Sequence, residues 1–342
     1  MRILIILTII LLTAACHRQK SIEYEPIGEC REVSIKAHPL NDTTAFGMAR
    51  HIVAMDSLLV VYDDLQQDKI HIFDRRTGRH MGASLRIGQS YDEIISPSTF
   101  SCDEKSGLIA VYDLANGALK VCDPSSAMRD RNPGWHKISL PDYQHMPKDV
   151  YLTQDTDVIA IHSNPRITKS HDRQVLAIYD ELPVLPDELE SEWMFFLSQT
   201  MSAISPDGEK LVQGTTLGCI MEIFRIEGND ISPVTLKCFD RPVYSVARGQ
   251  ICTLPETVYG FADLQASNDF IYATIHGVAN PTVFPNVIHV FDWKGNIVKK
   301  FVSDQQICCF NVDKSSGEIY AVVLGTDQEQ HLVRFDMAED NT

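Results

Sequence analysis

Hydrophobic residues along this chain occur in short runs separated by polar turns, and a two-part unit of such runs recurs. Each unit has a turn rich in Asp, Ser or Gly, an apolar run, a second turn, and a run in which apolar and polar residues alternate. The first example is LLVVYD at 58–63 followed by KIHIFD at 69–74. A continuous apolar run predicts a strand covered on both faces, and an alternating run predicts a more exposed strand.

The unit occurs six times, and the intervals between its end positions are 44–67 residues. The shorter intervals match the roughly 40–50 residues of one four-stranded propeller blade. We therefore predict an all-β protein, a six-bladed β-propeller. Residues 31–37 (REVSIKA) alternate but have no partner in a unit of their own, whereas the last unit lacks an outer strand. We expect the N-terminal strand to complete the last blade and close the ring, which removes exposed sheet edges. The units end at Asp74, Asp123, Asp180, Arg225, Asp292 and Asp336.

Composition supports a globular protein that does not bind nucleic acid. The chain has 342 residues, of which 44% are hydrophobic and 22% charged. Its 30 Lys and Arg against 46 Asp and Glu give a net charge of −16, which repels a phosphate backbone. Nine cysteines are present without a C-x-x-C motif, and we interpret most of them as small buried residues within strands.

The N-terminus predicts export. Met1-Arg2 precedes an apolar run from Ile3 to Leu12, and small residues follow up to Cys16. This pattern is typical of a secretory signal peptide, and the run is shorter than the roughly 20 residues that span a bilayer. Thr13-Ala14-Ala15-Cys16 resembles the lipobox of bacterial lipoproteins, although Thr13 stands where that motif usually has Leu. The resemblance implies cleavage before Cys16 and acylation of its side chain; a plain signal peptide with a chance Cys remains the alternative.

The predicted organisation is a signal peptide over 1–15, a lipidated linker over 16–29 and the propeller over 30–342. No acidic run follows Cys16, since the next residues are His17-Arg18-Gln19-Lys20. The signal and the lipobox predict a location in the bacterial cell envelope, lipid-anchored in the outer membrane. The absence of an acidic run, which lipoproteins exported to the cell surface often carry, favours the side that faces the periplasm.

Three passages resemble TolB-like propeller lipoproteins of the Bacteroides group and the related NHL propellers. SPDGEK at 205–210 is similar to a common TolB-type turn, and GFADL at 260–264 followed by DFIYA at 269–273 resembles a strand of that family. GQSYDE at 88–93 stands where relatives have a Gly- and Pro-containing motif, which is degraded here. The resemblance implies the fold and an exported lipoprotein, and it implies no reaction.

Metalloprotease, nucleophile-elbow and P-loop motifs are absent from the sequence. Loops that follow the second strand of each blade converge on one face of a propeller, and two of them look long, 164–173 and 277–286. We select as candidate binding residues Asp63, Asp113, His162, Arg166 and His276. Carboxylates and imidazoles at one mouth could hold a divalent cation. The alternative is that Asp63 and Asp113 accept turn hydrogen bonds.

We predict a binding or interaction module, anchored to the membrane by its N-terminal lipid, whose partner is a peptide, a glycan or a protein. No cofactor is required by this prediction. The alternative is a metal-assisted hydrolase or lyase with its site in the central funnel. We also expect a short helix over 188–197 and a connection over 241–257 that covers one face.

Overall fold

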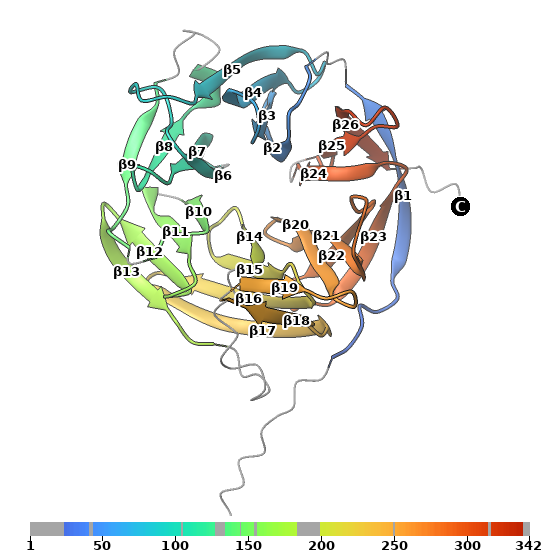
Figure 1. Cartoon of the computed structure of the whole chain (residues 1–342). Coiled ribbons are helices and arrows are strands. Elements are labelled where there is room, and N and C mark those ends of the chain that lie inside the picture. The colour runs from blue at the N-terminus through green and yellow to red at the C-terminus, as the bar shows by residue number, and fades with distance from the viewer. Residues whose placement is uncertain are drawn as a thin grey trace, which may run out of the picture.

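The computed structural model describes residues 24–40, 44–103, 105–126, 134–143, 145–153, 156–182, 199–248, 250–313 and 316–337. In this part of the chain, antiparallel sheets are arranged radially around a central axis (Figure 1). The all-β propeller predicted from the repeat is confirmed. No helix in the described residues is both long and apolar enough to cross a membrane.

Four of the units are separate four-stranded sheets that follow one another along the chain. In each of them the chain runs from the innermost strand to the outermost strand. The first has β2 (Ala49–Met55), β3 (Leu58–Asp63), β4 (Asp68–Asp74) and β5 (His80–Arg86); the second has β6 (Pro97–Asp103), β7 (Leu108–Asp113), β8 (Ala118–Cys122) and β9 (His136–Ser139). The third has β10 (Asp149–Leu152), β11 (Val158–Ile161), β12 (Ile167–His171) and β13 (Gln174–Tyr179); the fourth has β14 (Thr200–Ile204), β15 (Lys210–Thr215), β16 (Cys219–Glu227) and β17 (Asp230–Asp240).

The fifth and sixth units are joined into one eight-stranded sheet by the N-terminal strand, β1 (Arg31–Pro39). β1 pairs antiparallel with β26, with Ile35 opposite Met337 and Pro39 opposite Val333. It also pairs in parallel with β23, with Arg31 opposite Lys299. The predicted pairing of the N-terminal strand with the last unit is therefore observed. The strands of these units are β20 (Val258–Ala266), β21 (Phe270–Ala279), β22 (Val287–Asp292) and β23 (Ile297–Ser303), then β24 (Gln306–Val312), β25 (Ile319–Leu324) and β26 (Gln330–Met337).

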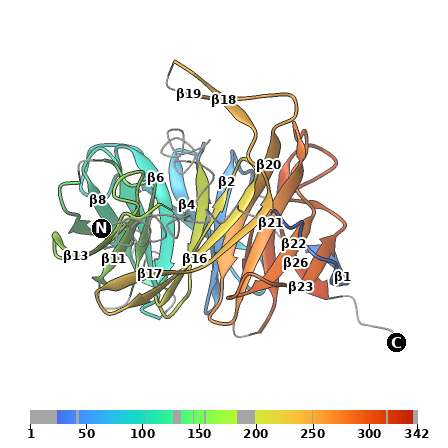
Figure 2. The same ribbon diagram turned by 90° about the horizontal axis from the view of Figure 1, so that it is seen from below.

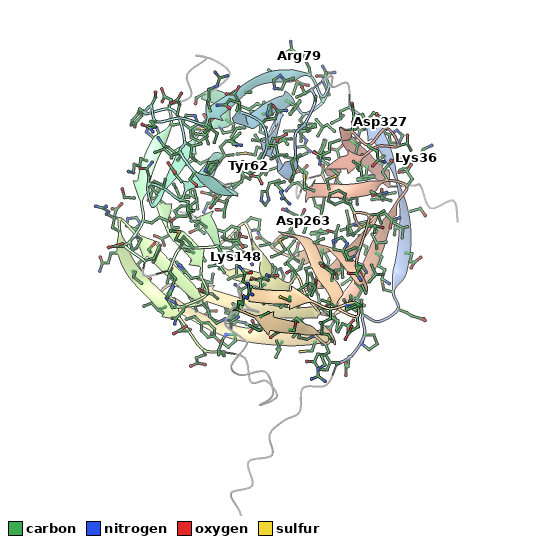
Figure 3. The ribbon with its side chains drawn as sticks, in the orientation of Figure 1. Lys36, Tyr62, Arg79, Lys148, Asp263 and Asp327 are labelled. Atoms are coloured by element: carbon green, nitrogen blue, oxygen red, sulfur yellow. The ribbon has the colours of Figure 1, made fainter. Side chains whose placement is uncertain are left out.

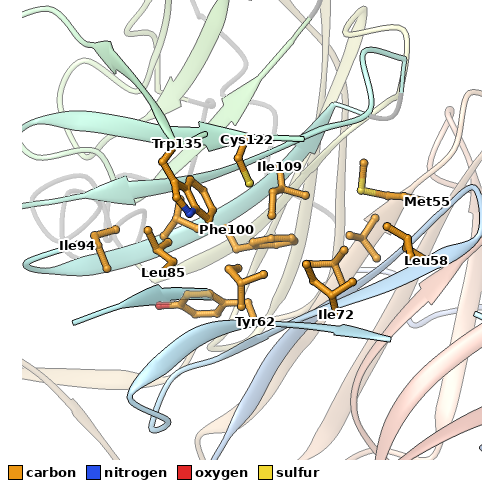
Figure 4. Packing of buried hydrophobic residues seen from close by; sticks show 14 residues of the cluster. Met55, Leu58, Tyr62, Ile72, Leu85, Ile94, Phe100, Ile109, Cys122 and Trp135 are labelled. Atoms are coloured by element: carbon orange, nitrogen blue, oxygen red, sulfur yellow. The ribbon is translucent and has the colours of Figure 1, made fainter. Parts of the chain in front are cut away.

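The hydrophobic core is divided among the junctions between neighbouring units. One cluster fills the junction between the first and second units, where Tyr62 and Phe100 stack with ring centroids 6.0 Å apart and Trp135 closes the outer end (Figure 4). The second strands are largely buried, as in LLVVYD of β3, because a sheet covers each of their faces. Burial of each large apolar side chain contributes about 1.5–3 kcal/mol, so these junctions are the main source of stability.

Two predicted connections differ from the structure. The predicted long loop 164–173 contains β12. The alternating run QVLAIY at 174–179, which the repeat predicts as the third strand of its unit, is therefore the outermost strand, β13. The sequence ITKSH of β12 is short and polar, so its pairing with the apolar β11 decides its conformation. The connection 241–257 contains a hairpin of β18 (Tyr244–Ala247) and β19 (Gln250–Thr253), which projects from one face of the ring (Figure 2). The predicted helix at 188–197 lies outside the described residues.

Candidate functional site

The two faces of the ring have different connections. The loop face, which we define by the connections from second to third strands and from one unit to the next, has these described residues: 40, 44–48, 64–67, 87–96, 114–117, 140–143, 145–148, 162–166, 180–182, 199, 216–218, 241–248, 250–257, 280–286, 304–305 and 325–329. The turn face carries the remaining connections, such as Asp56-Ser57 and Gly228-Asn229. The candidate residues chosen from the sequence all lie at or near the loop face, at the ends of second strands or just after them.

Asp63 and Asp113 occupy equivalent positions at the ends of β3 and β7, and both are fully buried. The Asp63 carboxylate accepts hydrogen bonds from the backbone N–H groups of Gly47 at 2.7 Å and Met48 at 2.9 Å. It also accepts from the N–H groups of Leu65 and Gln66, both at 3.0 Å. These bonds tie the segment that enters the first unit to the β3–β4 turn, so they organise the loop face from beneath it.

Asp113 repeats this arrangement in the second unit. Its carboxylate accepts from the Ser96 N–H at 3.1 Å and from the Asn116 side-chain amide at 2.5 Å. The alternative interpretation of both aspartates, as acceptors of turn hydrogen bonds, therefore has direct geometric support.

His162 and Arg166 flank the β11–β12 turn and are 3% and 2% exposed. His162 lies 3.1 Å from the His145 carbonyl through Nδ1 and 3.1 Å from the Thr168 hydroxyl through Nε2. Burial lowers the pKa of His162 to about 4, so the ring is neutral at pH 7. Both ring nitrogens are already engaged by protein groups.

Arg166 crosses the junction between the third and fourth units. Its guanidinium forms an ion pair with Glu222 and donates to the Gln213 side chain at 3.2 Å. It also lies over the rings of Tyr179 and Phe224, 5.8 and 5.6 Å from their centroids. A cation this thoroughly enclosed holds two units together and is not accessible to a partner.

His276 lies in β21 and belongs to the most accessible part of the loop face. Its ring meets Tyr259 edge-on at 6.3 Å, and burial lowers its pKa. Tyr259 belongs to a small apolar cluster that also holds Tyr244 and Ile251 of the hairpin. The hairpin is thus packed through Tyr244 and Ile251, whereas its Ala247, Cys252 and Thr253 are exposed.

Exposed apolar side chains distinguish the loop face from the rest of the described surface. Seven of the large exposed hydrophobic residues lie there, and an eighth lies in the last residues of β21. The described turns of the opposite face carry none. Val283 is 58% exposed and Phe284 40%, beside the hairpin, and Leu65 is 66% exposed on the other side of the ring. The complete set is Leu65, Tyr91, Ile95, Met146, Leu182, Val278, Val283 and Phe284.

The axial channel holds a cavity of about 120 Å³ lined by the innermost strands. Polar side chains on these strands connect neighbouring units. Ser101 accepts from the Leu152 N–H at 3.4 Å, Asn311 from the Ala54 N–H at 3.0 Å, and Asp263 from the Phe310 N–H at 3.3 Å. An innermost strand has a free edge, so these bonds satisfy backbone donors that no further strand can pair.

Two carboxyl groups in the channel have perturbed pKa values. Burial raises the pKa of Asp263 to about 7, although hydrogen bonds from the backbone N–H groups of Phe310 and Leu264 oppose the shift. Figure 3 shows the Asp263 side chain at the axial opening. Burial also raises the pKa of Asp149, opposed by Lys148 and by the Ser202 hydroxyl, which donates to Asp149 at 2.5 Å. His51, in the same lining, has its pKa lowered to about 4 by burial and by Arg50.

Sequence reasoning identified the loop face but not the channel residues or the hairpin. Asp149 begins β10 and Asp263 lies within β20. In the sequence, each is a single carboxyl group beside apolar residues, and this pattern does not indicate a channel. The five selected residues are spread over four units and do not converge on the axis. No group of three or more His, Cys, Asp or Glu within the described ranges is placed to hold a metal ion.

Comparisons with known proteins agree with this architecture. The profile of a family described as TolB-like 6-blade propeller-like matches residues 241–315. The chain has a β-propeller fold, and this stretch of it is similar to the TolB-like family. A Bacteroides fragilis protein described as exported superposes with a TM-score of 0.57 at 9% identity, over 92% of this chain and 99% of that chain.

The β-propeller domain of Cps50 (Swd1) from Myceliophteria thermophila superposes with a TM-score of 0.50 at 10% identity, over 88% of this chain and 100% of that chain. At these identities the likeness concerns the fold alone. No curated protein matches the sequence.

Proposed function

We propose that this propeller is an exported, lipid-anchored interaction module that binds a partner protein through its loop face. Export is supported by the N-terminal signal and by the exported Bacteroides fragilis protein that shares the fold. The anchor is the acylated Cys16, and the location is the periplasmic side of the outer membrane.

The observation that carries the proposal is the one-sided distribution of exposed apolar side chains. Isolated exposed hydrophobic residues are common on any surface. Here they gather in loops that a rigid ring holds in place, which is typical of an interaction surface. The buried carboxylates of Asp63 and Asp113 fix the conformations of two of these loops.

A paired substitution tests the binding surface. Val283→Ser and Phe284→Ser remove apolar area from the loop face, whereas Val234→Ser does the same on the exposed outer strand β17. We expect the first two to weaken partner capture from a membrane extract by about tenfold or more, because truncating an interface anchor commonly costs 1–2 kcal/mol or more. Val234→Ser should leave capture unchanged. Equal capture by all three variants would contradict the proposal.

The anchor is tested separately. Cys16→Ala should abolish labelling by a radioactive fatty acid and release the protein from the membrane fraction, while Cys30→Ala should change neither. Each acyl CH₂ contributes about 0.8 kcal/mol to membrane binding, so the loss of the chains is decisive. Persistent labelling of the Cys16→Ala protein would show that the lipid is not at this residue.

A further inference from the structure

The described chain starts beside the loop face. Tyr24 packs against the buried cluster of Leu217, Ile220 and Cys238, which also contacts Tyr244 and Ile251 of the hairpin and Tyr259. The next residue donates its N–H to the Cys238 carbonyl at 2.9 Å, near the loop-face end of β17. From there the chain runs toward the turn face, where a Cβ on Gly28 would lie 3.6 Å from the Ile297 side chain at the start of β23.

The distance from the predicted lipid to this point is short. Eight residue steps separate Cys16 from Tyr24, and a fully extended chain spans about 26–29 Å over eight residues. Along β17, the ten residues from Cys238 to Gly228 on the turn face cover about 30 Å. A lipid at Cys16 therefore cannot pass beyond the turn face, whereas the loop face lies next to the attachment point.

We infer that the loop face is turned toward the bilayer and that its partner is a protein embedded in the same membrane. This inference rests on the proposed function, since it takes Cys16 as the anchor and the loop face as the binding surface. It adds the orientation of the ring and the class of partner.

Two observations favour an embedded protein over the lipid itself. The exposed apolar side chains come from loops around the ring, from Leu65 in the first unit to Phe284 in the fifth, and do not form one wedge that could enter a bilayer. Exposed acids such as Asp142, Glu256 and Glu329 lie among them, and the chain has a net charge of −16, so anionic headgroups repel this face. A protein surface can meet a ring of separate apolar contacts surrounded by polar groups.

The orientation is tested with the acylated protein reconstituted in phosphatidylethanolamine vesicles that carry a headgroup quencher. A fluorescent amino acid is placed at Phe284 on the loop face or at the exposed Asn229 on the turn face. We expect at least twofold stronger quenching at 284 than at 229. Equal quenching, or stronger quenching at 229, would overturn the inferred orientation.

The partner class is tested in intact cells with a photo-cross-linking amino acid at the same two positions. Adducts at 284 with a protein that resists carbonate extraction, absent at 229, support the inference. Adducts only with lipid, or only with soluble envelope proteins, overturn it. Inserting a flexible segment of about 30 residues after Lys20 should reduce the adducts several-fold, because the longer tether lowers the local concentration of the loop face.

These outcomes are separable from failure of the proposed function. If the wild-type protein carries no acyl group, the anchor itself is wrong. If it is acylated and the fluorescence order is reversed, only the orientation and the embedded partner are wrong.

Discussion

Arg166 was selected from the sequence as a candidate binding residue, and its environment explains why residue type alone misleads. An Arg beside a proline on a predicted long loop is expected to be exposed, but the loop contains β12, which carries Arg166 into a junction between two units. There its charge is balanced by Glu222, and its flat guanidinium packs on two aromatic rings. Burial of a charge is tolerated because a partner of opposite charge is buried with it.

Arg166→Met is expected to lower the free energy of unfolding by about 3–5 kcal/mol, because it leaves the Glu222 carboxylate buried without its cation. Adding Glu222→Gln should recover most of that loss. The matched control is Arg225→Met, whose ion pair with Glu227 is exposed and worth about 1 kcal/mol or less. Urea unfolding of the four proteins measures these differences, and similar losses for Arg166→Met and Arg225→Met would refute the structural role.

Asp263 gives a pH-dependent prediction. Its pKa of about 7 in the folded protein is above the roughly 3.9 of an unfolded Asp, so the folded state binds the proton more tightly between these values. Stability attributable to this group is therefore present at low pH and is lost as the pH rises toward 7. Asp263→Asn keeps an oxygen acceptor for the Phe310 N–H but removes the buried charge.

The stability advantage of Asp263→Asn over the wild type should grow by about 1–3 kcal/mol between pH 5 and pH 8. Asp269→Asn, at an exposed turn of the same unit, serves as the control and should show no such growth. Chemical denaturation at both pH values is the measurement, and a pH-independent difference between Asp263→Asn and the wild type would disprove this account.

At the scale of elements, strands that are apolar on both faces were predictable and polar or short strands were not. LLVVYD and LIAVYD are buried along most of their length, so their patterns reflect the two sheets that cover them. β12 has only five residues, and its apolar and polar residues alternate weakly. It is a strand because it pairs with β11, and this pairing cannot be predicted from the local sequence. The hairpin β18–β19 is mostly exposed, so no hydrophobic period marks it.

The candidate site shows the same limit. The loop face could be predicted because strand order places alternate connections on one side of a propeller. The exposed Val283 and Phe284 lie in the loop that follows β21. The place where this loop begins depends on how far β20 and β21 stay paired, and their last pair is Val258 opposite Ala279. Burial in the channel, which shifts the pKa of Asp263, arises from five other strands that are distant in sequence.

The closing strand β1 is the element whose loss should have the largest effect. Ile35 is 3% exposed and packs in the core of the last units, whereas the adjacent Ser34 is exposed. Ile35→Asp should lower the thermal midpoint by many degrees or cause aggregation, because it buries an unpaired charge and frees an edge of β26. Ser34→Asp should shift the midpoint by only a few degrees. Circular dichroism and size-exclusion chromatography distinguish these outcomes, and equal behaviour of the two variants would contradict closure by β1.

At the scale of the whole molecule, the two ends of the described chain meet in one sheet. β1 and β26 pair although they lie at opposite ends of the described sequence. At the turn face, the Arg75 guanidinium of the first unit forms ion pairs with Asp313 and Glu318 of the sixth, at 2.5 and 3.0 Å. Each unit is therefore packed between two neighbours, and the ring has no terminal unit with an exposed face. Such a ring is expected to unfold cooperatively, since opening one junction exposes the cores on both sides.

Closure depends on strand pairing and not on the point at which the chain begins. Because Ile35 lies opposite Met337 and residues 31–34 extend beyond the end of β26, a chain that starts at Leu40 and continues from Met337 through a flexible linker of about eight residues into residues 31–39 would restore the β26–β1 pairing with the native register. This rearranged protein should unfold in a single urea transition, with a free energy of unfolding within about 2 kcal/mol of that of the intact protein. The same chain without residues 31–39 should aggregate or unfold at a much lower urea concentration. Fluorescence-monitored urea unfolding provides the comparison. If the rearranged chain is no more stable than the deletion, the pairing of β1 with β26 is not what stabilises the ring. The stabilising contribution would then come from the segment before β1, where the N–H of residue 25 bonds the Cys238 carbonyl of the fourth unit.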